Sequence, residues 1–237
     1  CLLAALAAGA GVLRAVVNLG ERRRAFVSAV THELRTPLTT FRLYSEMLAD
    51  GMIADEPKRQ EYFQKLRDES LRLSHLVENV LAYSRLSGPR RGPARQRIAL
   101  GELVHRGCDA LADLAARAGM ELAVEPAADA AAMVVEADVA AVEQILVNLV
   151  DNACKYAHSA EDKSIRIAIS REGRWAVIRV CDAGPGVPPD QRRRLFRDFS
   201  RSAADAAGNS PGVGLGLAIS RRLARQMGGD LRLEKTT

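Results

Sequence analysis

The sequence predicts an α+β protein: a helical hairpin that pairs with a second copy as a dimeric four-helix bundle, followed by an α/β sandwich. Three observations lead to this fold class. Residues 14–86 carry apolar side chains at steps of three and four, the spacing of a helical stripe. Residues 87–97, SGPRRGPARQR, are rich in Pro, Gly and Arg without periodicity, which is typical of a linker. Beyond the linker, helical and strand patterns alternate.

The chain begins with thirteen almost wholly apolar residues, CLLAALAAGAGVL, before Arg14. A helix needs about 20 such residues to cross a bilayer, so we interpret residues 1–20 as the inner end of a transmembrane helix running into a signalling helix. Arg22–Arg24 follow the apolar run, and basic residues flank a transmembrane helix on its cytoplasmic side. A signal peptide instead carries its basic residues ahead of the apolar run. We therefore expect the cytoplasmic portion of an inner (plasma) membrane protein, with a buried soluble helix as the alternative.

Residues 21–86 predict the hairpin itself. The first helix runs from about residue 14 to 50, Gly51 ends it, and Pro57 opens a second helix that reaches about Leu86. The apolar positions are Val16, Leu19, Phe26, Val30, Leu34, Leu38, Phe41 and Leu48 in the first helix, and Tyr62, Phe63, Leu66, Leu73, Leu76, Val77, Val80 and Leu81 in the second. A lone hairpin leaves half of each stripe exposed to water, so we expect a homodimer.

Residues 98–237 predict a sheet covered by helices, because helical and strand patterns alternate there. The predicted helices are 101–118, 138–157, 189–195 and 213–227, and the predicted strands are 121–125, 132–136, 164–170, 175–181 and 230–234.

Composition excludes several classes of function. The formal net charge is +5, but aromatic residues make up only 4% of the chain, and nucleic-acid binders interleave basic residues with aromatics or a reading helix. No nucleic-acid partner is therefore expected, and the arginine clusters are interpreted as solvated surface and linker. The four cysteines show no CxxC or CxH spacing, which argues against zinc and suits a reducing cytoplasm.

His32 is the first candidate for chemistry, in the segment FVSAVTHELRTPLT. Because the apolar stripe passes through Val30 and Leu34, His32 points outward. A lone helical His is usually an ordinary surface residue, but a neutral imidazole is also a good nucleophile toward phosphorus, and Glu33 beside it can orient it or accept its proton. Pro37 inside the helix costs a hydrogen bond and bends the axis.

The second candidate is one face of the helix QILVNLVDNACKYA, residues 144–157. Asn148 and Asn152 are four residues apart, and Lys155 and Tyr156 follow at three and four, so all four share a face. Carboxamide oxygens coordinate Mg²⁺, a lysine neutralises phosphate, and a tyrosine packs on a base. Asn and Lys are also common on exposed helices, and that alternative stays open.

Two glycine-rich segments complete the set. Asp182-Ala-Gly-Pro-Gly186 follows a predicted strand, and a carboxylate there suits an adenine amino group while Gly184 and Gly186 let a ligand approach; the segment is equally compatible with a simple turn. Gly212-Val-Gly-Leu-Gly-Leu217 opens a helix, whose free N–H groups attract phosphates. A dinucleotide-binding turn would follow a strand, whereas a loop precedes this one.

In this order, the segments resemble the motifs of sensor histidine kinases of two-component systems. His32–Leu38 resembles the H-box in an unbroken match, and residues 144–157 resemble the N-box. Asp182–Gly186 resembles the G1 box, with Ala183 where Asn is usual. Phe196 and Phe199 resemble the F-box, with Arg197-Asp198 in place of the usual Glu-Pro and Arg201 matching a frequent Arg. Gly212–Leu217 resembles the G2 box.

The resemblance implies a HisKA-type dimerisation and phosphoacceptor domain at 21–86, a linker at 87–97 and a HATPase_c Bergerat-fold domain at 98–237. That family usually adds one more strand beyond Thr237. It implies ATP-dependent phosphorylation of His32, assisted by Glu33, and transfer to an Asp of a response-regulator receiver domain. Thr36 matches a position that orients water in kinases that also dephosphorylate their regulator.

The resemblance also implies the ligand set for ATP and Mg²⁺. Asn148 and Asn152 lie at the metal, Lys155 at phosphate and Asp182 at adenine. The remaining nucleotide-binding residues are Tyr156, Gly184, Gly186, Phe199, Arg201, Gly212, Gly214, Gly216 and Leu217. The alternatives are a Bergerat-fold ATPase and a non-catalytic dimeric scaffold. Related hydrolases carry a water-activating Glu where Asn148 stands, and a scaffold would tolerate degenerate motifs.

Overall fold

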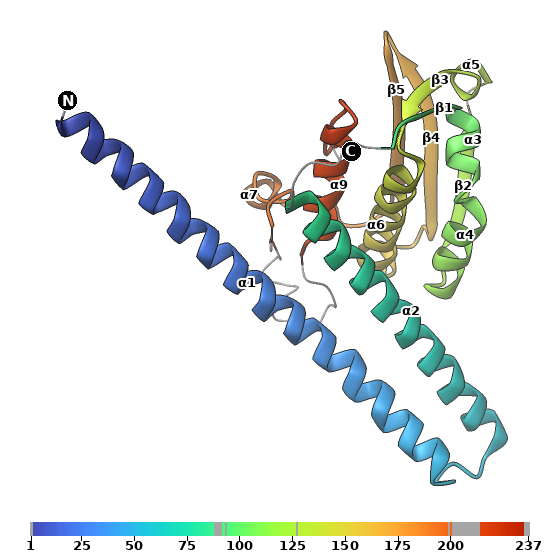
Figure 1. Cartoon of the computed structure of the whole chain (residues 1–237). Coiled ribbons are helices and arrows are strands. Elements are labelled where there is room, and N and C mark those ends of the chain that lie inside the picture. Colours follow the sequence, from blue (N-terminus) through green and yellow to red (C-terminus); the bar gives the residue numbers. More distant parts are fainter. Residues whose placement is uncertain are drawn as a thin grey trace. The chain divides into compact units, whose positions relative to one another are not determined.

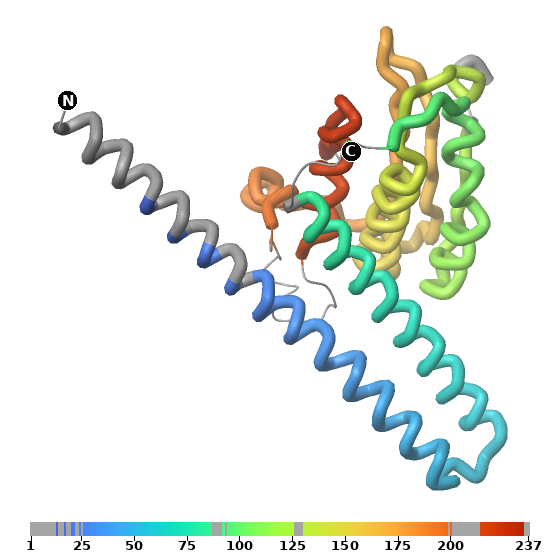
Figure 2. Tube along the Cα trace, in the orientation of Figure 1, coloured from blue at the N-terminus to red at the C-terminus, as the bar shows by residue number. Residues whose placement is uncertain are grey.

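The computed structural model describes residues 2–87, 92, 94–126, 128–198, 200 and 214–234. Figure 1 shows their helices and strands, and Figure 2 traces the same chain from blue to red. The described residues form two compact units that separate between Leu81 and Ala82. Each unit is described by itself below.

The first unit is a helical hairpin. Helix α1 spans Leu2–Ala49 and helix α2 spans Glu56–Ser87, which confirms the two predicted helices and extends the first toward the N-terminus (Figure 1). Gly51 has a φ of 65°, a left-handed conformation that ends a helix cheaply only at glycine. Near this turn, the rings of Tyr44 and Tyr62 pack edge to face with centroids 4.9 Å apart. Within the described part of the chain, no helix combines the length and apolar character needed to cross a membrane.

Each helix of the hairpin leaves a row of large apolar side chains exposed. The rows are Val27, Leu38 and Phe41 on α1, and Phe63, Val77 and Leu81 on α2. On α1, Leu38 follows Val27 by 11 residues, and Phe41 follows Leu38 by 3 and Val27 by 14. On α2, Val77 follows Phe63 by 14 residues and Leu81 follows Val77 by 4. These spacings bring the members of each row to one side of their helix. The hairpin thus buries only part of its apolar surface within one chain.

The second unit contains helices and two small sheets. Its elements are β1 (Gln96–Ala99), α3 (Leu100–His105), α4 (Cys108–Arg117), β2 (Glu121–Pro126), α5 (Ala128–Ala131), β3 (Val134–Ala137), α6 (Val139–Ala157), β4 (Ser164–Glu172), β5 (Trp175–Asp182), α7 (Pro189–Arg192) and α9 (Gly216–Gln226). Strands β1 and β3 pair antiparallel, with Ile98 opposite Val135. In the other sheet the order is β2-β4-β5, where β2 is parallel and β5 antiparallel to β4.

The core of this unit lies between the β2-β4-β5 sheet and helices. Strand β4 alternates, with Ile165, Ile167 and Ile169 buried as expected of a sheet with one covered face. These side chains join Leu146 and Val150 of α6 in one apolar cluster. The predicted α+β class, a helical hairpin followed by a helix-covered sheet, is confirmed.

Three expectations about elements were wrong. The single helix predicted for 101–118 is two helices, α3 and α4, because Gly107 takes the N-cap position of α4 and glycine is a poor interior helix residue. The last two residues of the predicted linker 87–97 belong to strand β1, which pairs with β3 and whose Ile98 is buried. In addition, the short helix α5 lies in a stretch for which no element was predicted.

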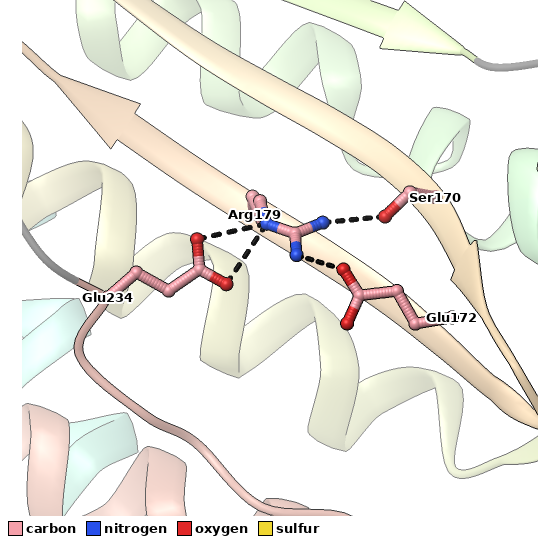
Figure 3. A network of polar contacts seen from close by, with 4 residues as sticks. All are labelled: Ser170, Glu172, Arg179 and Glu234. Atoms are coloured by element: carbon pink, nitrogen blue, oxygen red, sulfur yellow. Dashed lines mark hydrogen bonds and ion pairs between the residues drawn. The ribbon is translucent and has the colours of Figure 1, made fainter.

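The third error is the strand predicted for residues 230–234, which has no regular secondary structure. Side-chain ion pairs fix this segment in place of a backbone ladder. Asp230 accepts hydrogen bonds from Arg221 and Arg225 of α9. The Nε of Arg179, on β5, donates to both carboxylate oxygens of Glu234 at 3.0 Å. The same guanidinium also binds Ser170 and Glu172 (Figure 3).

Candidate functional site

His32 is exposed on α1, as the sequence predicted. It follows Val27 by five residues, which places it about 140° around the helix from the exposed apolar row. A partner that covers the apolar row therefore leaves His32 on a different side of the helix. The imidazole is accessible to a reactant in solution.

Glu33 turns toward the second helix of the hairpin. Its side chain is only 11% exposed, and its carboxylate lies 3.9 Å from the Arg72 guanidinium of α2. Arg72 also donates to Glu69 at 3.2 Å. An ion pair across the hairpin thus fixes the residue next to His32. Pro37, one turn further along, is buried and supplies no N–H to the Glu33 carbonyl.

Thr36 is exposed, and its hydroxyl differs from those of Thr31 and Thr39. Thr31 donates to the Val27 carbonyl at 2.7 Å and Thr39 to the Arg35 carbonyl at 2.8 Å, the usual back-bonding of helical threonines. Thr36 makes no such bond to any residue that the structure describes. Its hydroxyl is therefore available to a water molecule or a partner.

In the second unit, Asn148 joins α6 to α9. Its side chain is 6% exposed, and its Nδ2 donates to the Ser220 hydroxyl at 3.1 Å and the Gly216 carbonyl at 3.4 Å. A side chain on Gly216 would approach the Asn148 Oδ1 to 3.4 Å. The carboxamide is thus oriented by its amide hydrogens, with its oxygen close to the start of α9.

The other three residues of the predicted face differ in exposure along α6. Asn152 is half-buried and Tyr156 is 46% exposed. The ammonium of Lys155 forms a short ion pair with Asp151, one turn earlier. An acid and a base at i and i+4 of a helix are spaced to form such a pair, but the pair was not predicted from the sequence.

The Asp182 turn is built around its own carboxylate. Asp182 ends β5 with its side chain exposed, and its Oδ1 accepts the Gly184 N–H at 2.8 Å. A Cβ on Gly184 would lie 2.7 Å from that oxygen and 3.4 Å from the Ala157 Cβ, so only glycine fits. Gly186 has a φ of 70°. The turn therefore holds one carboxylate oxygen at the end of α6.

Among the described residues, no side chain caps the start of α9. Gly214 has a φ of 70°, and Gly216 opens the helix after Leu215, a residue that provides no side-chain cap. Leu217 follows in the first turn. The structure brings Gly216 to Asn148, and Gly184 to the end of α6. The remaining predicted positions, Phe199, Arg201 and Gly212, lie outside the described residues.

The donors suit Mg²⁺ rather than a softer metal. In the described residues, no three His, Cys, Asp or Glu side chains gather as a metal site. Asn148 and Asn152 offer neutral amide oxygens, which Mg²⁺ accepts together with phosphate oxygens. Cys154, between Asn152 and Lys155, is buried, and burial raises the pKa of its thiol to about 11, so it is no thiolate ligand.

Sequence reasoning also missed Ser220. It is fully buried, and a buried hydroxyl needs a partner, which Asn148 provides. The available signal was its spacing, since Ser220 follows Gly216 by one turn on the apolar side of α9, beside Ile219.

Two family models match the chain. Residues 22–89 match the His Kinase A (phospho-acceptor) domain, and residues 137–237 match the histidine kinase-, DNA gyrase B-, and HSP90-like ATPase. His32 lies in the first region, and Asn148, Asp182 and Gly216 lie in the second.

Curated relatives align along nearly the whole chain. The sensor protein KdpD of Mycobacterium tuberculosis is 34% identical over 98% of this chain and 26% of its own length. The sensor histidine kinase MtrB of Mycobacterium bovis is 33% identical over 88% of this chain and 36% of its own length. The chain thus spans about a quarter to a third of the length of these relatives.

Two solved structures share the fold. Full-length ShkA in complex with AMPPNP superimposes with a TM-score of 0.55 at 27% identity, over 85% of this chain and 40% of that chain. The histidine kinase AdeS of Acinetobacter baumannii gives a TM-score of 0.56 at 24% identity, over 82% of this chain and 86% of that chain.

Proposed function

The chain belongs to the sensor histidine kinases of two-component systems, and from that premise we propose that it phosphorylates its own His32 with the γ-phosphoryl group of ATP. The observation that carries the proposal is the presence, in one chain, of an exposed His32 in a phosphoacceptor domain and an uncapped glycine-rich helix start in an ATPase domain. Each is common alone. Together they supply both reactants of a phosphoryl transfer.

In the proposed nucleotide site, Asp182 accepts a hydrogen bond from the adenine amino group. Its Oδ1 is already held by the Gly184 N–H, so the other oxygen is oriented before the nucleotide arrives. The N–H groups of Gly214, just before α9, and of Gly216, its first residue, bind phosphate oxygens, as helix starts do. ShkA was solved in complex with AMPPNP, an ATP analogue, which supports ATP as the nucleotide.

Lys155 and the two asparagines complete the proposed site at the phosphates. The Lys155 ammonium, paired with Asp151 in the structure, offers its positive charge to the phosphates. Asn148 and Asn152 would hold Mg²⁺, which supplies charge neutralisation when bound. Asn148 also argues against ATP hydrolysis as the main activity, because its carboxamide has no proton-accepting group for activating water. Tyr156 packs beside the base.

The proposed transfer is a single displacement. An imidazole nitrogen of His32 attacks the γ-phosphorus, the bond to the β-phosphate oxygen breaks, and ADP leaves. The imidazole proton passes to Glu33 or to solvent. Glu33, whose carboxylate lies 3.9 Å from the Arg72 guanidinium, is the acidic residue next to His32 in the chain. Positioning and charge neutralisation do most of the catalytic work in such transfers.

We extend the proposal to three partners. The exposed apolar rows on α1 and α2 pair with those of a second copy, giving a homodimeric four-helix bundle. The phosphoryl group passes from His32 to an Asp of a response-regulator receiver domain. The apolar residues 1–13, followed by Arg22–Arg24, anchor the protein at the inner face of the plasma membrane.

The test is a labelling experiment with γ-³²P ATP and Mg²⁺. The protein should acquire a label that is lost in acid and kept in base, as a phosphoramidate is. EDTA should prevent labelling. A label stable in acid, or release of inorganic phosphate without any labelled protein, would show that the chain carries a different activity.

A further inference from the structure

Helix α9 presents two different sides to its surroundings. Ala218, Ile219 and Ser220 are buried, and Ser220 accepts the Asn148 hydrogen bond from α6. The neighbouring Arg221 and Arg222 contact the segment that follows α7. The helix that begins at Gly216 therefore also holds a distant stretch of chain.

The contact with that stretch is an ion pair and a cation–π contact. The Arg222 Nη2 donates to the Asp198 Oδ2 at 2.6 Å, with the Asp198 side chain only 16% exposed. The Arg221 guanidinium lies over the Phe196 ring, 4.8 Å from its centroid. A charge-assisted bond to a largely buried carboxylate is stronger than an open surface pair.

Asp198 is in turn connected to the adenine side of the proposed site. The Arg192 Nε donates to the Val187 carbonyl at 2.9 Å, directly after Gly186. From there, backbone bonds continue the coil of α7, from Arg194 to Gln191 and from Arg197 to Arg194. The stretch from Val187 to Asp198 is thus tied together along its length.

We propose that Arg222 and Asp198 are positioning residues for the nucleotide, because their ion pair ties the Asp182–Gly186 turn to the helix whose start binds phosphate. The inference rests on the proposed nucleotide site. Neither residue touches ATP in it. Their pair fixes the distance between the group that reads adenine and the N–H groups that bind phosphate, so losing it leaves the two halves free to shift.

The experiment compares two charge-removing variants with opposite changes of net charge, Asp198→Asn and Arg222→Gln. The dissociation constant of ATP–Mg²⁺ is measured by titration calorimetry on the whole chain. Loss of the Arg222–Asp198 ion pair should weaken ATP–Mg²⁺ binding about fivefold in both variants. A purely electrostatic effect would have opposite signs, because Asp198→Asn makes the surface more positive and should then tighten binding of the anionic nucleotide.

The double variant Asp198→Arg, Arg222→Asp restores the pair with reversed polarity and unchanged net charge. It should bind ATP within about twofold of wild type. Arg225→Gln is the matched control, since Arg225 lies on the same helix but binds Asp230; its ATP affinity should equal that of wild type. Unchanged affinity in both single variants, or a double variant weaker than either, would overturn the proposal.

Hydrogen exchange without nucleotide separates this proposal from the proposed function. Amides of residues 191–198 should exchange faster in both single variants and return to the wild-type rate in the swapped double variant. Wild-type protein that fails to bind ATP would contradict the kinase assignment and the nucleotide role of the pair, while the exchange rates would still report whether the tie exists. Unchanged exchange would refute the tie itself.

Discussion

At the scale of single residues, the most constrained position in the proposed site is Gly184. A methyl group there meets the Asp182 Oδ1 at 2.7 Å, closer than side-chain carbons normally approach, so Gly184→Ala should displace the carboxylate. We expect roughly tenfold weaker ATP binding with little loss of stability, since the displaced Asp182 side chain is exposed. The control is Gly92→Ala, because a Cβ at Gly92 has no neighbour within 4 Å. Equal affinity in both variants would show that Asp182 does not read the nucleotide.

Thr36 gives a second prediction at this scale. Thr36→Ala should leave labelling of His32 largely unchanged and lower the rate at which the kinase dephosphorylates its regulator. The back-bonded Thr39 provides the comparison, since Thr39→Ala removes a hydroxyl from the same helix without touching Thr36. If Thr36 only shapes the helix before Pro37, both activities should fall together. Rates of labelling and of regulator dephosphorylation, measured in parallel, decide between the two.

Residue types in the candidate site were predictable, but their partners were only partly so. Asn148 lies on the predicted helix but is buried, and its bond to Ser220 joins residues 72 positions apart, a pairing that periodicity cannot indicate. Lys155 shows the opposite case, because its bond to Asp151 is local and visible at i and i+4. Long-range pairs such as Arg222–Asp198 need the fold.

At the scale of elements, the end of α9 depends on Asp230. Arg221 foremost, and Arg225 with it, hold the pKa of that carboxyl well below its usual range. A depressed folded-state pKa stabilises the protein at pH above the unfolded value and loses that contribution as pH falls. Asp230→Asn should therefore cost up to about 1 kcal/mol at pH 7 and progressively less below about pH 4.

Urea unfolding of the Asp230→Asn variant and wild type at pH 7 and pH 3 measures this difference. Asp113→Asn on the exposed side of α4 serves as the control and should match wild type at both pH values. A constant gap between Asp230→Asn and wild type at both pH values would mean that packing, not charge, is responsible.

Element boundaries followed the sequence wherever periodicity was long. Helices α1, α2 and α6 and strands β2, β4 and β5 lie within a few residues of their predicted positions, apart from the start of α1. The failures have local causes. Gly107 divides a helix that has one continuous apolar pattern, and β1 is only four residues long inside a stretch dominated by Pro, Gly and Arg. Residues 230–234 have the composition of a strand but are fixed by side-chain ion pairs.

At the scale of the whole molecule, the exposed rows on the hairpin predict the dimer. Phe63 and Val77 lie on one side of α2 and are about half exposed in the single chain. Replacing both with Arg places two charges where a partner helix would pack, which should dissociate the dimer at micromolar concentration. Sedimentation equilibrium gives the mass. Met52→Arg, an exposed apolar residue in the turn, should leave the dimer intact, and a monomeric wild type would exclude the bundle.

The most direct measurement separates the phosphoacceptor from the nucleotide site in two variants, His32→Gln and Asn152→Ala. Each is assayed for ATP affinity and for acid-labile labelling by γ-³²P ATP. His32→Gln should bind ATP as wild type does and acquire no label. Asn152→Ala should lose roughly 30-fold or more in ATP affinity, since removing the carboxamide takes away one oxygen ligand of Mg²⁺, and should label little. Full acid-labile labelling of His32→Gln, or wild-type ATP affinity in Asn152→Ala, would contradict autophosphorylation of His32 from this site.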